Sequence, residues 1–323
     1  MFGYLRFFLA FVVMLSHVDV RFYGMNPGVS AVVVFYILAG YVVSHLYHDI
    51  LPDGKYKLFY FLKDRILRIF PLYLYVIAVT VLFLLLSDFG DPHFTFIKTL
   101  NNLLIVPLNY YMYIDSAILT EPKWWLIPPA WSLGTELQAY IVLALLFSFQ
   151  KYKRTFVLFS FIIYILANFS IIHPDYYGYR FLVGVLFIFL IGTYIQKKEY
   201  KFPYFIWGFI LFVLVPFFYF TDSFSPTYTR ETFLGLVVGI PLVSFLSRTK
   251  IKLPFNALLG SLSYGLFLSH FLAIWILHYF KIHFSLQIYD IFFIFFIANL
   301  IALVGVKYVE KHIEPLRMLK KTK

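Results

Sequence analysis

The chain has 323 residues, of which 62% are hydrophobic and 23% aromatic but only 13% charged, and its formal net charge is +11. This composition excludes a soluble globular protein of that length and indicates a polytopic membrane protein. The absence of cysteine excludes disulfides, thiolate metal sites and a cysteine nucleophile.

Apolar stretches long enough to cross a bilayer recur along the whole chain. We predict an all-α polytopic membrane helix bundle with about ten transmembrane helices, forming a single integral-membrane domain over 1–323 without a fused soluble domain. The predicted spans are 4–20, 28–47, 66–87, 131–149, 154–172, 180–196, 203–221, 231–247, 260–280 and 287–308. The stretch 96–114 is apolar but carries three asparagines and a proline. We therefore predict a re-entrant or interfacial piece there, within a long outer loop.

Lysine and arginine predict the orientation of these spans. With a cytoplasmic N-terminus, 21 of the 27 lysines and arginines fall on the cytoplasmic side. Both termini are therefore predicted to be cytoplasmic. The cations are scattered among short loops, so the lipid bilayer is the expected partner of this charge, and no nucleic-acid partner is predicted.

The first predicted span contains two ionisable residues, Arg6 and His17. Eleven residues are about three helical turns, so the side chains share a face and lie about 16 Å apart along the axis. Because an ionisable residue at such depth is costly, the pair is a functional-site hypothesis. A signal peptide is the weaker interpretation, because no small-residue cleavage site follows.

Two arginines precede the third predicted span, in KDRILRIFPLY. Arg65 and Arg68 have i, i+3 spacing, so both guanidinium groups can reach one phosphate-rich ligand. The alternative is a positively charged anchor at the cytoplasmic face. Arg6 enters the membrane from the same predicted side, so three arginines could converge around a polyphosphate.

Two further residues within predicted spans carry ionisable groups. Glu136 lies about one turn inside the fourth span, where a carboxylate needs a partner. It could lock two helices together or transfer a proton. His270 lies near the middle of the ninth span, at a depth similar to that of His17. It is either a packing residue or a second functional histidine.

The predicted outer loop, 87–129, is rich in aromatic residues. Tyr111, Trp124 and Trp125, with Trp131 just after the loop, could form an interfacial belt or a platform on which sugar rings stack. No metal site is predicted: His45 and His48 have i, i+3 spacing but lack the carboxylate–histidine motif of a metal centre.

Five motifs occur in a fixed order along the chain: Arg6-x10-His17, FYILAGY at 35–41, Arg65-x-x-Arg68 followed by IFPLY, Trp131-Ser-Leu-x-x-Glu136-x-Gln, and SYGLFLSH at 263–270. This order resembles the membrane-bound acyltransferase-3 family over nearly the whole chain. The chain departs from the family pattern at three positions, Ala39, Leu137 and Ala139, where a serine, a second acid and an aromatic residue are usual.

The resemblance implies a membrane O-acyltransferase of the bacterial inner (plasma) membrane. Such enzymes move an acyl group, usually acetyl, from cytoplasmic acyl-CoA to a hydroxyl of a saccharide acceptor. The expected co-substrate is therefore acetyl-CoA. The expected acceptor is an extracytoplasmic or lipid-linked glycan, such as lipopolysaccharide O-antigen, capsule or exopolysaccharide. By resemblance, His17 is the essential catalytic residue, Arg65 and Arg68 are the paired arginines, and Glu136 is the motif carboxylate.

The expected mechanism places the nucleotide phosphates on Arg6, Arg65 and Arg68 and the thioester at His17. His17 would act as a general base or carry the acyl group itself. Glu136 or His270 would orient its ring. Asp19 is about 200° around the helix and is poorly placed to do so. Two other classes compete: a saccharide carrier or exporter in which these charges line a path, and a regulatory protein that has lost catalysis.

Overall fold

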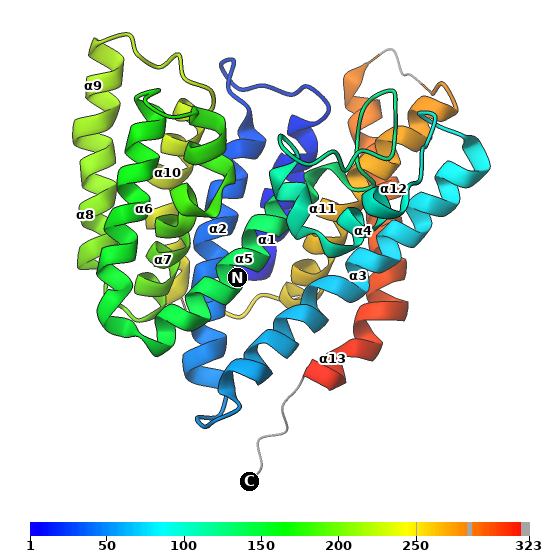
Figure 1. The fold of residues 1–323 in the computed structure, drawn as a ribbon. Helices are drawn as coiled ribbons and strands as arrows, with labels where there is room; N and C mark the ends of the chain where they lie inside the picture. The colour runs from blue at the N-terminus through cyan, green and yellow to red at the C-terminus, as the bar shows by residue number, and fades with distance from the viewer. Residues whose placement is uncertain (250, 283–285, 318–323) are drawn as a thin grey trace. The chain divides into compact units, whose positions relative to one another are not determined.

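The computed structural model of the chain describes residues 1–249, 251–282 and 286–317. Within these ranges the chain is helical and contains no strand longer than an isolated bridge (Figure 1). The helices are α1 (Phe2–Ser16), α2 (Pro27–His45), α3 (Lys57–Ser87), α4 (Phe96–Leu104), α5 (Trp131–Ser148), α6 (Lys153–Asn168), α7 (Leu182–Gln196), α8 (Lys201–Phe209), α9 (Val215–Phe220), α10 (Thr229–Arg248), α11 (Asn256–Tyr279), α12 (Gln287–Gly305) and α13 (Lys311–Arg317).

Short helical turns of other kinds extend or join these helices. The π-helical turns are Leu46–Ile50, Tyr176–Arg180, Ile210–Leu214 and Val306–Glu310. The 3-10 turns are Val106–Tyr110, Pro128–Ala130 and Gln150–Tyr152. Because several of the π turns continue a neighbouring helix without a break, α2 with its turn and α12 with its turn and α13 each form one long helical segment.

Eight helical segments of the described chain are long and apolar enough to cross a membrane: Pro27–Ile50, Lys57–Ser87, Pro128–Ser148, Tyr176–Gln196, Lys201–Phe220, Thr229–Arg248, Asn256–Tyr279 and Gln287–Arg317. The predicted all-α polytopic bundle is therefore confirmed. The other two predicted spans, 4–20 and 154–172, correspond to α1 and α6, which have 15 and 16 residues. At 1.5 Å per residue these helices measure about 22–24 Å, less than a hydrocarbon core of about 30 Å.

The described chain groups into two compact units, each built from segments that are distant in sequence. The first unit consists of Met1, Asp19–Leu62 and Thr135–Leu253. The second consists of Phe2–Val18, Lys63–Gly134 and the described residues from Pro254 onward. Helices α3 and α5 each begin in one unit and end in the other. The orientation of the termini and the single-domain organisation stay predictions.

In the first unit, α2 packs against α7 and α10, and α6 packs against α7. Asn26 starts α2 by accepting a hydrogen bond from the Gly28 N–H, and Pro27 follows at the first helical position. Gly40, within the FYILAGY motif, lies so close to α7 that a Cβ there would be 1.8 Å from the Phe189 carbonyl oxygen. Only glycine allows this approach of two helices.

In the second unit, α11 packs against both α1 and α12, although α1 and α11 are about 250 residues apart in sequence (Figure 1). The Gly3 N–H donates to the Asn256 side chain at 2.9 Å, and a Cβ on Gly3 would lie 1.8 Å from the Asn256 carbonyl oxygen. At the other end of the pair, His17 contacts His270. Both contacts join residues 253 apart, so α1 and α11 are parallel and in constant register.

Candidate active site

Two groups of polar residues lie at different levels of the α1–α11 pair. An arginine cluster includes Arg68, whose Nη2 is 3.4 Å from the Gly260 carbonyl oxygen near the start of α11. A histidine pair, His17 and His270, lies ten residues further along α11. Ten residues of α-helix span about 15 Å. The register of one helix pair therefore sets the distance between the two groups.

The histidine pair is formed where α1 ends. His17 follows the last residue of α1 and its side chain is exposed, whereas His270 is completely buried within α11. The His270 Nε2 atom lies 3.2 Å from His17 Nδ1, and the two rings stack with centroids 5.1 Å apart. The two histidines are thus in direct contact, and their depth in the membrane stays a prediction.

The hydrogen bonds of His270 fix which nitrogen of each ring carries a proton. His270 Nδ1 lies 3.1 Å from the Leu266 carbonyl oxygen, which can only accept, so Nδ1 carries the hydrogen. A neutral ring is favoured in this buried position, and its Nε2 is then an acceptor. His17 Nδ1 must donate to it. When the His17 ring is neutral, its lone pair is then on Nε2, the nitrogen that can take up a proton.

Aromatic rings surround the histidine pair and connect it to the outer loop. The Phe271 ring is 4.8 Å from the His17 ring and 5.2 Å from the His270 ring. The Trp124 ring also lies 5.7 Å from the Phe271 ring, measured between centroids. Trp124 is partly buried, so its side chain is accessible in part.

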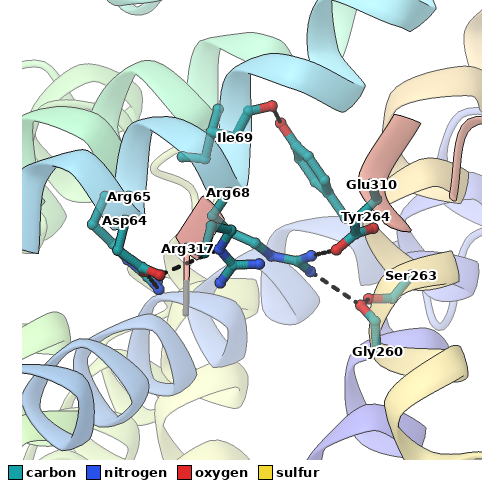
Figure 2. Close-up of polar contacts among 9 residues, drawn as sticks. All are labelled: Asp64, Arg65, Arg68, Ile69, Gly260, Ser263, Tyr264, Glu310 and Arg317. Atoms are coloured by element: carbon teal, nitrogen blue, oxygen red, sulfur yellow. Dashed lines mark hydrogen bonds and ion pairs between the residues drawn. The ribbon is translucent and has the colours of Figure 1, made fainter. Parts of the chain in front are cut away.

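The arginine cluster joins α3 to the C-terminal helical segment (Figure 2). Arg65 donates to Asp64 through Nε at 3.0 Å and through Nη2. Arg317, in α13, donates through Nε to the other oxygen of Asp64 at 3.2 Å. Arg68 donates to Glu310, which lies in the π turn before α13. Charge-assisted bonds of this kind hold guanidinium groups in fixed orientations.

The cluster carries more positive than negative charge. The charges of Arg6, Arg317 and Arg65 all act on Arg68, and Arg6 acts most strongly. The structure therefore brings the three arginines of the sequence hypothesis together, with a fourth that the hypothesis did not include. Two carboxylates, Asp64 and Glu310, face these four guanidinium groups. A partly buried site with excess positive charge suits an anionic ligand.

The SYGLFLSH motif supplies contacts at both levels of α11. Tyr264 donates from its hydroxyl to the Ile69 carbonyl oxygen of α3 at 3.0 Å, and its ring lies 5.7 Å from the Arg68 guanidinium (Figure 2). Tyr264 therefore joins the arginine-bearing part of α3 to α11.

The next residues of the motif bind α11 to α12. Gly265 lies so close to Ala302 that an added Cβ would be 2.5 Å from its Cβ. Ser269 donates to the Ala298 carbonyl oxygen at 2.9 Å and to that of Gly265 at 2.8 Å. These contacts fix the rotation of α11 just before His270, so most of the motif positions the histidine.

Asn102 organises the loop 87–129. Its side-chain N–H groups donate to the carbonyl oxygens of Lys98 and Ser116, and its side-chain oxygen accepts from the Leu126 N–H at 2.8 Å. The Tyr73 hydroxyl donates to the Asn102 carbonyl oxygen at 2.6 Å. The stretch 96–114 therefore forms α4 and a 3-10 turn instead of a spanning helix, as predicted, and one of its asparagines holds the loop together.

The predicted aromatic residues of the loop differ in accessibility. Tyr111 is half-buried and lies 5.1 Å from Trp125, measured between ring centroids. Trp125 is only 5% exposed and lies edge-on to Trp124 at 5.5 Å. Trp124 is thus the more accessible of the two tryptophans, and Trp125 is buried against it.

The start of α5 explains the Trp-Ser-Leu-Gly sequence in packing terms. Trp131 is the first residue of α5 and is half-buried. Ser132 donates to the Pro129 carbonyl oxygen at 3.0 Å and so supports the first turn of the helix. Gly134 allows α5 to approach the 3-10 turn, because a Cβ there would lie 2.9 Å from Asn109 Cβ.

Glu136 belongs to the first unit, whereas His17 belongs to the second. Within its unit, Glu136 accepts a hydrogen bond from the Tyr140 hydroxyl one turn along α5. Its charge and that of Arg180 both act on Tyr36. Glu136 is thus part of a polar group within the first unit, and a role in orienting His17 stays a prediction. His270 does contact His17.

Four residues of the site were not predicted from the sequence: Asp64, Phe271, Glu310 and Arg317. Asp64 was visible as an acid inside the basic KDRILR segment. Glu310 and Arg317 gave no signal, because both lie in a charged C-terminal segment typical of membrane proteins. Among the described residues, no group of three or more histidine, aspartate or glutamate side chains could hold a metal ion.

Comparisons with known proteins identify the family of the chain. A family model described as an acyltransferase domain, that of the acyltransferase-3 family, matches residues 2–307. The chain is 42% identical over 218 residues to an uncharacterised protein of Aquifex aeolicus (strain VF5), covering 64% of this chain and 98% of that protein. It is 30% identical over 139 residues to "Protein 2 in picA locus" of Rhizobium radiobacter, covering 38% and 70% respectively. No solved structure matches the chain. This multi-pass membrane protein belongs to the acyltransferase-3 family.

Proposed function

We propose that the protein transfers an acyl group, with acetyl as the expected one, from cytoplasmic acyl-CoA to a hydroxyl of an extracytoplasmic saccharide. One observation carries this proposal. The parallel helices α1 and α11 hold a cationic cluster at one level and an accessible imidazole at another, about 15 Å along the helix axis. Acyl-CoA has the same two ends, a phosphate-rich nucleotide and a thioester on an extended arm.

The arginine cluster would bind the nucleotide. Arg6, Arg65 and Arg68 supply positive charge that two carboxylates do not balance, and phosphates would provide the missing negative charge. Planar guanidinium groups suit phosphate oxygens better than ammonium groups do. With the nucleotide at this level, the pantetheine arm would extend along α1 and α11 and bring the thioester carbonyl to His17.

His17 would act as the general base. Its Nε2 would accept the proton of the acceptor hydroxyl while the hydroxyl oxygen forms a bond to the thioester carbonyl carbon. The carbon–sulfur bond then breaks, and the proton passes from Nε2 to the leaving thiolate of CoA. Throughout the cycle, His17 Nδ1–H would donate to His270 Nε2 and keep the ring in place. His270 would thus be a positioning residue.

The acceptor would bind on the other side of His17. Trp124 offers a partly open ring linked through Phe271 to the histidine pair, and sugar rings stack on such faces. Tyr111 and Trp131 would extend this platform, and Trp125 would support it from beneath. A lipid-linked or envelope glycan at the bacterial inner membrane, such as O-antigen, capsule or exopolysaccharide, fits such a platform.

The test is acyl transfer by protein reconstituted into lipid vesicles, with acetyl-CoA and membrane glycans supplied and products identified by mass spectrometry. Wild-type protein should add the mass of one acetyl group to a glycan, and His17→Ala should abolish the addition while the protein remains folded. The matched control is His93→Ala, since His93 is an exposed histidine of the outer loop.

Three results would change the proposal. Undiminished transfer by His17→Ala would contradict the role of His17. Movement of a glycan across the vesicle membrane without any acylation would contradict the enzyme and favour a carrier. An acetyl group covalently bound to His17 after incubation with acetyl-CoA alone would replace the general-base step by an acyl-histidine intermediate.

A further inference from the structure

We infer that Arg317, in α13, binds a phosphate group of the acyl-CoA donor, so that the C-terminal helical segment forms part of the donor site. This inference rests on the proposed function and extends it to a residue outside the recognised motifs.

Arg317 is anchored through a carboxylate shared with the RxxR motif. Asp64 is only 9% exposed and accepts from both sides: one oxygen from Arg65 Nε and Nη2, the other from Arg317 Nε (Figure 2). Asp64 therefore holds two guanidinium groups at a fixed separation, one from α3 and one from α13. The end of the C-terminal segment is thereby tied to the arginine cluster.

The arginines of Figure 2 differ in which nitrogens they commit to the protein. Arg65 uses Nε and Nη2 for Asp64, and Arg68 uses Nη1 for Glu310 and Nη2 for the Gly260 carbonyl. Arg317 uses Nε alone, and within the described residues neither of its terminal nitrogens makes a hydrogen bond. Its side chain is 20% exposed, so a ligand can reach it.

This arrangement matches the way arginine recognises phosphate. A guanidinium held at Nε has its two terminal nitrogens directed away from the anchor, and they can donate in parallel to two phosphate oxygens. Arg65 and Arg68 would then supply the positive field, while Arg317 supplies a free donor edge. The paired arginines of the motif are more constrained than their sequence pattern indicates.

The charge of the C-terminal segment supports the same conclusion. Arg317 is one of the three arginines whose charges act on Arg68. Asp64 and Glu310 offset only part of the repulsion among these four arginines in a partly buried site. A phosphate at Arg317 would offset it.

The experiment measures CoA binding to the purified full-length protein in detergent by calorimetry. Arg317→Ala should weaken CoA binding on the order of tenfold, the size expected for a charge-assisted pair. In the transfer assay it should raise the KM for acetyl-CoA and leave kcat and the acceptor KM near wild type. The matched control is Lys311→Ala, which removes one positive charge from an exposed position of the same helix and should change CoA affinity less than twofold.

A second variant separates phosphate binding from a structural role. Arg317→Lys keeps the charge and can still pair with Asp64, but it lacks the planar pair of terminal donors, so CoA binding should stay severalfold weaker than wild type. Full wild-type affinity in Arg317→Lys, or equal affinity in Arg317→Ala and Lys311→Ala, would overturn the inference alone. If wild-type protein bound no CoA, the proposed function itself would fail, and this inference with it.

Discussion

Different interactions hold the polar side chains at the two levels of the α1–α11 pair. At the arginine cluster, charges of both signs crowd together, and Arg65, Arg68 and Arg317 each donate to a carboxylate. At the histidine pair, two rings are held by each other, by a backbone carbonyl and by aromatic neighbours. The first arrangement suits the binding of an anion, and the second suits the movement of a proton.

One helix pair can serve both purposes because its two polar groups are kept apart. A cation at the histidine level would favour the deprotonated, uncharged ring but would compete for the donor's phosphates. A neutral histidine in the arginine cluster would bind phosphate weakly. Separation by about 15 Å weakens the mutual effect of the two groups, and the parallel register keeps that separation constant.

The largest effect within this comparison is expected for His270. His270→Ala removes the acceptor of His17 Nδ1–H, so the His17 ring loses its orientation and its tautomer. We expect kcat to fall about 100-fold, within the range typical of general-base catalysis, with little change in the KM for acetyl-CoA. Steady-state kinetics on the reconstituted protein measures both constants.

Rescue distinguishes positioning from packing at this position. In His270→Gln the side-chain oxygen can replace Nε2 as an acceptor. The kcat of this variant should be at least tenfold higher than that of His270→Ala. His270→Leu fills similar space without an acceptor and should resemble alanine. If leucine restored activity as well as glutamine did, His270 would be a packing residue only.

Much of the fold was predictable because hydropathy alone determines which segments can enter a bilayer. Prediction from hydropathy fails where a helix extends beyond its apolar residues. Helix α3 begins at Lys57, although the apolar segment was predicted from 66, and the last helical segment continues to Arg317 instead of ending near 308. Hydropathy does not identify charged residues at a helix end as part of a membrane helix. These extensions nevertheless carry Asp64 and Arg65 before the third span and Glu310 and Arg317 after the last one.

The site was predictable only in part, because its contacts join residues that are distant in sequence. The sequence indicated Arg6, His17 and His270 as ionisable residues of apolar segments, although α1 ends at Ser16, one residue before His17. The contact between the histidines depends on the register of α1 and α11, which Gly3 and Asn256 help to fix and which no local pattern encodes. Likewise, the partner of Arg68 is Glu310, 242 residues away in sequence.

An intermediate effect is expected at the arginine cluster, from Glu310→Gln. The loss of this carboxylate leaves Arg68 partly buried without its counter-ion, which should cost about 1–3 kcal/mol of stability and lower the melting temperature in detergent by a few degrees. Because CoA phosphates can replace the lost charge, CoA should raise the melting temperature of this variant more than that of wild type.

The matched control for this prediction is Glu314→Gln, at an exposed position of α13. It removes the same charge from the same segment and should leave the melting temperature unchanged. Equal stabilisation of wild type and Glu310→Gln by CoA would mean that the ligand does not interact with Arg68. For the His270 variants, CoA should raise the melting temperature by the same amount as for wild type. This difference distinguishes the arginine cluster from the histidine pair.

The smallest effect is expected at Trp124, on the acceptor side of the histidine pair. Trp124→Ala removes the open ring next to Phe271 and should raise the acceptor KM about three- to tenfold, the size of one stacking contact, with the KM for acetyl-CoA unchanged. Trp124→Phe keeps an aromatic face and should recover part of the loss. Tyr113→Ala, which removes an exposed aromatic of the same loop, should have no effect. A rise in the acetyl-CoA KM of Trp124→Ala would instead connect the outer loop to the donor and break the division between the two levels.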